Sequence, residues 1–89
     1  MTDELEIVKA RFRTRCARDL VALDSVGTGE WQADCQTIVH RLAGISSTLG
    51  FQRLGLLSAE IDSQLIAGRQ PRPRQVEELC KVLRKAAGT

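Results

Sequence analysis

The chain has 89 residues, of which 43% are hydrophobic and 27% charged, a balance that fits one small globular domain over residues 1–89 and argues against a disordered chain. A formal net charge of +2, with Trp31, Phe12 and Phe51 as the whole aromatic complement, argues against a nucleic-acid partner. The acidic N-terminus has no signal-peptide pattern and no apolar run approaches the roughly 20 residues that span a bilayer, so we expect a cytoplasmic location and no membrane partner.

The first helix is predicted over residues 3–24, with Thr2 as its N-cap and two acidic residues in its first turn. One face carries the residues expected in the core: Leu5, Val8, Phe12, Cys16, Leu20 and Leu23. The opposite face carries a second, weaker apolar stripe: Ile7, Ala10, Thr14, Ala17 and Val21. This stripe is either a solvated face with a few apolar residues or a surface that docks a protein or forms a dimer. The arginines beside it leave a nucleic-acid-binding bundle as a further alternative.

A glycine-rich turn follows, and a second helix is predicted over residues 30–49 with Gly50 as its left-handed C-cap. Its apolar face is Trp31, Cys35, Ile38, Leu42, Ile45 and Leu49. A third helix over residues 51–67 and a fourth over residues 74–86 flank a connection with two prolines, which cannot continue a helix. Their expected core residues are Leu54, Leu57, Ile61 and Leu65, then Val76, Leu79, Cys80 and Leu83. Four amphipathic helices with short connections predict an all-α fold, an antiparallel up-down-up-down four-helix bundle.

The inventory of reactive residues excludes most enzymatic functions. The three cysteines, at positions 16, 35 and 80, stand far apart and outside any C-x-x-C pair, so we expect them to be small buried hydrophobes. One histidine and scattered thiols are too few ligands for zinc, and the isolated glycines form neither a P-loop nor a dinucleotide fingerprint. We therefore expect this chain to bind no metal and no cofactor of its own.

His40, the single histidine, is predicted on the solvent-exposed face of the second helix, about 180° from its apolar stripe. Its neighbours on that face, Ala43, Gly44 and Ser47, are all small. A glycine inside a helix lowers helix stability by roughly 1 kcal/mol relative to alanine. Its position beside the one histidine therefore indicates a functional role. A neutral imidazole is a good nucleophile toward a phosphoryl group, and a bulky donor held by another protein needs a cleared approach.

The stretch HRLAGISSTLG over residues 40–50 resembles the phospho-acceptor motif of histidine-containing phosphotransfer (HPt) domains, commonly H-x-L-K-G-x-S/A-x-x-x-G. His40, Leu42, Gly44, Ser46 and Gly50 are in register with it, and residues 51–54 resemble the L/F-x-x-L that opens the family's next helix. Residues 10–23 look like the family's first long helix, so the resemblance covers most of the chain.

The resemblance implies a carrier of a two-component phosphorelay rather than a self-sufficient enzyme, with no autokinase activity. His40 would accept a phosphoryl group from a receiver-domain aspartate and pass it to another response regulator, within a system that includes a hybrid histidine kinase. The receiver would supply Mg²⁺ and dock on the surface around the histidine. The residues expected on that surface are Gln36, Thr37, Arg41, Ala43, Gly44 and Ser47. We expect a monomer.

One departure from the family's pattern bears on this function. Ala43 stands where the family usually has a lysine, which can help to neutralise the phosphoryl oxygens. Arg41 projects about 100° from His40 and is a poor substitute. The alternative function is therefore an HPt-like docking module that binds receiver or kinase domains without carrying phosphate. Asp62, in the third helix, is either a solvated surface acid or the hydrogen-bond partner that orients the imidazole.

Overall fold

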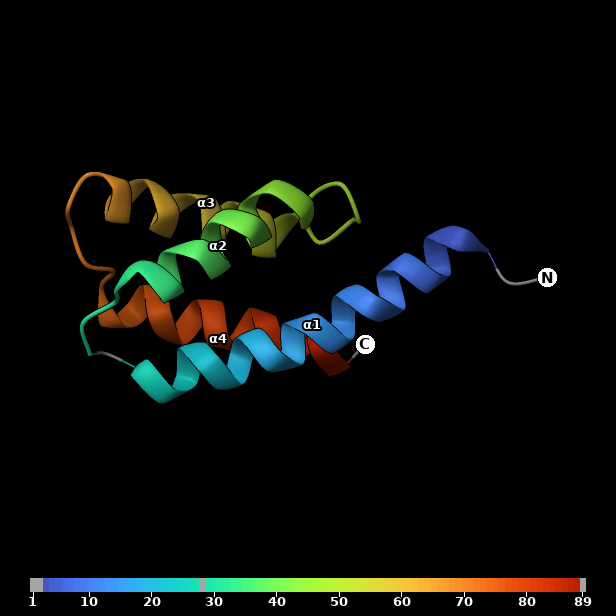
Figure 1. Ribbon diagram of the computed structural model, residues 1–89, viewed down its shortest axis with the longest axis horizontal. Helices are drawn as coiled ribbons and strands as arrows, with labels where there is room; N and C mark the ends of the chain where they lie inside the picture. Colours follow the sequence, from blue (N-terminus) through green and yellow to red (C-terminus); the bar gives the residue numbers. More distant parts are fainter. Residues whose placement is uncertain (1–2, 28, 89) are drawn as a thin grey trace.

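The computed structural model of the chain describes residues 3–27 and 29–88, and all of its regular structure within these ranges is helical (Figure 1). The four helices are α1 (Glu4–Val26), α2 (Ala33–Ile45), α3 (Gln52–Ile66) and α4 (Pro73–Gly88). The all-α prediction is confirmed. The residue expected to cap the first helix, Thr2, lies outside the described ranges.

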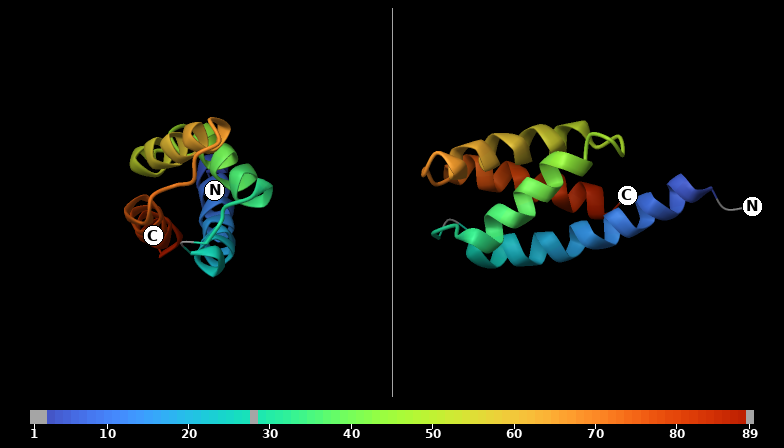
Figure 2. Two further views of the ribbon diagram at one scale, coloured as in Figure 1. Left: turned by 90° about the vertical axis from the view of Figure 1, so that its left-hand side faces the viewer. Right: turned by 45° about the horizontal axis from the view of Figure 1, so that its top comes forward.

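The helices pack as two pairs, because α2 lies mainly against α3 and α1 mainly against α4. The end-on view in Figure 2 shows the four helices around a shared core, with α1 between α4 and α2. The contact between α1 and α2 is the weakest of those between neighbouring helices. The molecule is elongated, 46 × 21 × 19 Å, because α1 continues past the other helices at its N-terminal end (Figure 1).

Helix α1 begins where the Asp3 side chain accepts a hydrogen bond from the Leu5 amide at 3.1 Å, which satisfies one of the free N–H groups of the first turn. It ends at Val26, two residues later than predicted, and is followed by Gly27, whose φ of 56° admits the chain reversal and whose amide donates to the Leu23 carbonyl. Most of the predicted core stripe is buried or half-buried, but Leu5 and Val8 are exposed. The second stripe of α1 is exposed along its whole length.

Helix α2 is shorter than predicted at both ends. At its start, the Gln70 side chain receives a hydrogen bond from the Trp31 amide at 2.7 Å and donates one to the Trp31 carbonyl at 3.0 Å, which holds the residues before Ala33 extended. At its end, residues 46–50 wind into turns, and the Phe51 amide donates to the Ser46 carbonyl at 2.8 Å. Gly50 closes these turns with a φ of 92°, a conformation that favours glycine.

The predicted apolar face of α2 is wrong in part. Ile38 is partly buried against the core, as expected, but Ile45 is exposed, and Val39, which the periodicity left out, is fully buried. The reason is that α2 packs mainly against α3 and only lightly against α1, so its buried face turns toward α3 and away from Ile45.

Helices α3 and α4 match their predicted core stripes closely. All eight expected core residues are buried except Leu65, which is partly buried against the core. Pro73 opens α4, a position where its fixed φ suits a helix and its missing N–H is not needed. In α3 the buried Gly55 faces Ser47, because a Cβ at Gly55 would meet the serine hydroxyl and backbone within close range.

The three cysteines are free and buried, as predicted. Burial among apolar groups raises the pKa of the Cys16 thiol from 9.0 to about 11, with the Asp19 carboxylate adding to the rise and Arg41 opposing it. Burial likewise raises the pKa of Cys80.

These thiols predict an alkaline loss of stability. Well below pH 9.0 the Cys16 thiol is protonated in both the folded and the unfolded chain, so it contributes no pH dependence. Between pH 9.0 and about 11 the unfolded thiol ionises and the folded one does not, which lowers the free energy of unfolding by up to about 1.4 kcal/mol per pH unit. Urea unfolding across this range should show that Cys16→Ala has a shallower loss than the wild type. Equal slopes would contradict the assignment to Cys16.

Candidate functional site

His40 lies in α2 with 75% of its side chain exposed, and its Nδ1 is 2.9 Å from Oδ2 of Asp62 in α3. The imidazole therefore spans the α2–α3 pair while its other nitrogen faces solvent. A carboxylate can only accept at this contact, so it favours the tautomer with the proton on Nδ1. The lone pair is then on Nε2, the exposed nitrogen, which is the arrangement that a nucleophilic histidine needs.

Asp62 is 8% exposed, so its interpretation as a solvated surface acid is wrong. Its Oδ2 faces His40, and its Oδ1 is buried with no hydrogen-bond partner among the described residues. A carboxylate in such surroundings holds its partner firmly, because few competing donors reach it. When the imidazole becomes cationic, the same contact becomes a charge-assisted hydrogen bond.

Few bulky side chains project from the surface around His40, as its small residues suggest. Gly44 is exposed, and a Cβ built on it would meet no atom within 4 Å. The packing of the chain therefore gives no reason for glycine here. Thr37 turns its hydroxyl back to the Ala33 carbonyl at 2.9 Å, which keeps its donor off the surface. Ser47 is exposed and faces Gly55 of α3.

The remaining residues expected on the docking surface are more enclosed. Gln36 and Ala43 are half-buried, and Arg41 has 31% of its side chain exposed. The Arg41 guanidinium points away from the α3 side of α2 and pairs with Asp19 of α1 at 2.7 Å. Arg15 of α1 reaches the same carboxylate at 3.7 Å. Asp19 is 3% exposed, and its buried charge makes these contacts structurally important.

Sequence patterns missed Asp19 as a partner. It lies between the core positions of α1, and the available signal was an acid on the buried side of a helix that also carries many arginines. Its partner Arg41 is 22 residues away, and only the packing of α2 beside α1 brings the two together.

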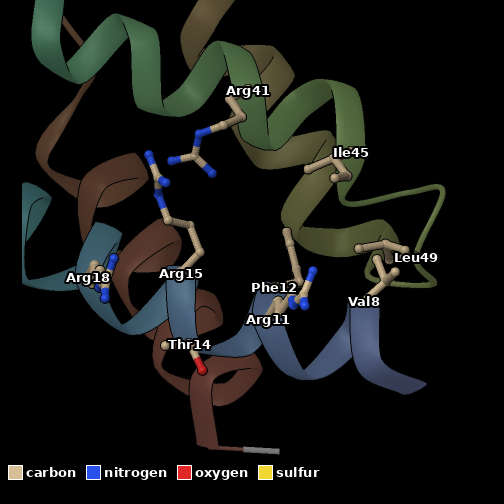
Figure 3. A pocket seen from close by; sticks show the side chains of 9 residues that line it. All are labelled: Val8, Arg11, Phe12, Thr14, Arg15, Arg18, Arg41, Ile45 and Leu49. Atoms are coloured by element: carbon tan, nitrogen blue, oxygen red, sulfur yellow. The ribbon is translucent and has the colours of Figure 1, made fainter. Parts of the chain in front are cut away.

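A groove of about 550 Å³ runs between α1 and α2 (Figure 3). Four arginines line it: Arg11, Arg15, Arg18 and Arg41. Its other lining residues are Val8, Phe12, Thr14, Ile45 and Leu49. Figure 3 shows Arg15, Arg18 and Arg41 toward one end, and Val8, Ile45 and Leu49 together at the other. The groove therefore has a basic end and an apolar end.

Within residues 3–27 and 29–88, no three side chains of histidine, cysteine, aspartate or glutamate come together as metal ligands. Within the same ranges, no helix combines the length and the apolar character needed to cross a bilayer.

Comparison with known proteins gives one positive result. The model of the Hpt domain family matches residues 8–88, which is nearly the whole chain and includes His40 and Asp62. The curated proteins and the solved structures contain no match to the chain. Hpt domains act in histidine phosphotransfer and interact with receiver and kinase components of phosphorelays. The exposed histidine, the helical fold and this match agree, and the chain belongs to the Hpt domain family.

Proposed function

We propose that His40 is the phospho-acceptor of a phosphorelay intermediate. It takes a phosphoryl group from the aspartyl phosphate of one receiver domain and passes it to another response regulator, in a relay fed by a hybrid histidine kinase. The observation that carries this proposal is the pairing of an exposed Nε2 with an Nδ1 held by Asp62 at 2.9 Å.

The chemistry of the step follows from that pairing. The Nε2 lone pair forms a bond to phosphorus while the bond from phosphorus to the receiver's carboxylate oxygen breaks, which leaves a free carboxylate on the receiver. The Nδ1 proton stays in place, so the ring becomes cationic and Asp62 compensates the charge. In the reverse direction the same contact returns the ring to its neutral tautomer, ready for another cycle.

The partner supplies what this chain lacks. Ala43 offers no charge to the phosphoryl oxygens, and the Arg41 guanidinium is engaged with Asp19. We infer that the receiver brings both its Mg²⁺ and the remaining positive charge, and that this chain binds no cofactor of its own. The receiver docks on the surface around His40. This surface is formed by Gln36, Thr37, Ala43, Gly44 and Ser47, with Arg41 at its border toward α1. The proposal includes a single domain over residues 1–89 with up-down-up-down order, which the course of the chain in Figure 1 supports.

A transfer assay tests the acceptor. Incubation with a phosphorylated receiver should move labelled phosphate to the wild-type chain, as an acid-labile and alkali-stable adduct that mass spectrometry maps to His40. His40→Gln should retain its helical circular dichroism and take no label. Equal labelling of His40→Gln, or no labelling from a panel of receivers, would reject His40 as the acceptor.

The same assay separates the alternative function, which Ala43 motivates. A docking module without phosphotransfer would bind receivers, as measured by calorimetry, and carry no acid-labile phosphate. Binding without label would therefore favour the docking module, and label on His40 would exclude it.

Substitutions at Gly44 should affect folding stability and phosphotransfer differently. Gly44→Ala should raise the free energy of unfolding by up to about 1 kcal/mol, because the helix gains propensity and the new methyl group meets nothing. Gly44→Gln should stay folded and lower the transfer rate, because its side chain stands where the receiver approaches.

The control for the Gly44 variants is Gly55→Ala. A methyl group at Gly55 would collide with Ser47, so this variant should lose stability. Unimpaired transfer by Gly44→Gln would contradict the idea of a cleared surface.

A further inference from the structure

The N-terminal end of α1 extends beyond the rest of the molecule (Figure 1). Leu5 and Val8 lie on the core-facing stripe of α1, yet they are 48% and 43% exposed, because α1 outruns the helices that cover this stripe further along. The stripe continues without a change of pattern from Phe12, which is 5% exposed. An apolar helix face that continues a core into solvent is typical of an interaction surface.

The charges of α1 are divided along its length. The N-cap Asp3 is acidic, as are Glu4 and Glu6 in the first turn, and we call residues 3–8 the acidic tip. The groove beside the same helix is basic at the end that lies further along α1 (Figure 3). Two of its arginines, Arg15 and Arg41, are paired with Asp19, whereas Arg11 and Arg18 have no ion-pair partner among the described residues.

The tip and the groove therefore complement each other in charge and in apolar character. The acidic residues of the tip cannot reach the basic end of the groove within one molecule, because that end lies further along the same helix. They can meet between two molecules whose α1 helices run antiparallel. In that orientation the acidic tip of one copy lies over the basic end of the groove in the other, and Val8 of each copy lies near the apolar end. A two-fold axis near Val8–Phe12 makes both contacts at once.

We propose that the chain forms a two-fold symmetric dimer in which each acidic tip occupies the α1–α2 groove of a second copy. This departs from the monomer expected at first, and it does not depend on phosphotransfer by His40. The interface uses the exposed part of the core stripe rather than the second stripe of α1. Its charged contacts lie at a partly open surface, so the dimer weakens as salt screens them.

Sedimentation equilibrium of the full chain tests this proposal with two reversed variants. The tip variant is Glu4→Lys/Glu6→Lys, and the groove variant is Arg11→Glu/Arg18→Glu, which leaves Arg15 and Arg41 on Asp19. The control is Arg69→Glu/Arg74→Glu, which makes the same change of charge as the groove variant at exposed positions in and after the α3–α4 loop. Circular dichroism verifies the fold of each variant.

The wild type and the control should dimerise, with a dissociation constant that rises at least about tenfold between low salt and roughly 1 M salt. Each reversed variant alone should be monomeric, because its two tip–groove contacts bring like charges together. An equimolar mixture of the two should form a one-to-one heterodimer, because both contacts then join opposite charges again.

Three results would overturn the proposal. The first is a wild-type chain that stays monomeric at every concentration. The second is a dimer that neither reversal weakens, which would place the interface elsewhere. The third is a mixture of folded variants that remains monomeric. In the second case, a groove variant that also loses receiver binding would show that the receiver, and not a second copy of this chain, occupies the groove.

Discussion

Asp62→Asn should slow phosphotransfer to His40 by about 10- to 100-fold while the domain stays folded. The variant keeps an oxygen that can accept from Nδ1, but it loses the negative charge that pairs with the ring once phosphorus is bound. A hydrogen bond to a charged group is worth about 1.5–3 kcal/mol and a neutral one about 0.5–1.5 kcal/mol, so loss of the charge costs up to about 2.5 kcal/mol, which falls within the stated range of rates. The 2.9 Å contact and the enclosure of Asp62 make the expected effect large.

The free energy of unfolding of Asp62→Asn should not fall, although its transfer rate does. Asp62 is nearly buried and one of its oxygens lacks a partner among the described residues, so removing its charge relieves a desolvation cost. Glu60→Gln is the matched control, because Glu60 is an exposed carboxylate on the same helix. It should transfer phosphate at the wild-type rate.

A positioning role for Asp62 has a spectroscopic signature that a merely structural role would lack. Nitrogen-15 shifts of the His40 ring should report the Nδ1–H tautomer in the wild type. In Asp62→Ala the Nε2–H tautomer should gain population, because nothing holds the proton on Nδ1. Asp62→Glu should recover part of the transfer rate. An unchanged tautomer together with an unchanged rate would show that the contact has no part in the reaction.

Helical periodicity and the motif at residues 40–50 predicted the features that depend on residues close together in the sequence. The all-α class, the core of α4 and the exposed His40 beside Gly44 follow from helical periodicity and the motif at residues 40–50. The burial of the cysteines follows in the same way. None of these depends on which helix lies beside which.

The features that escaped prediction all depend on contacts between distant residues. The start of α2 is set by Gln70, which is 39 residues from Trp31. The burial of Val39 and the exposure of Ile45 follow from the choice of α3 as the main neighbour of α2. The exposure of Leu5 follows from the length of α1 relative to its neighbours, and a periodic stripe carries no information about where its partner ends.

Arg41 illustrates how such a contact changes the interpretation of a residue. Its place next to His40 in sequence suggested the docking surface, whereas its guanidinium holds the buried carboxylate of Asp19. A loss of transfer in an Arg41 variant would therefore reflect instability unless folding is restored by a second change. The pair itself should be measured first.

Arg41→Met should lower the free energy of unfolding by about 3 kcal/mol, because it leaves Asp19 charged and buried with only Arg15 at 3.7 Å. For a domain of this size that is a drop in melting temperature of roughly 12–24 °C. Arg53→Met is the matched control, because it breaks a pair with Glu78 at 3.3 Å whose side chains are 66% and 37% exposed. Its cost should stay below about 1 kcal/mol.

The double variant Asp19→Leu/Arg41→Met should recover most of the lost stability, because replacing both members of a buried pair by apolar side chains removes the charge and the need for its partner. Urea unfolding of the wild type, the single variants Asp19→Leu and Arg41→Met, and the double variant measures the coupling directly. A double variant as unstable as Arg41→Met would show that the pair is not the cause. If the recovered double variant also transfers phosphate at the wild-type rate, then Arg41 serves the α1–α2 contact and has no part in receiver docking.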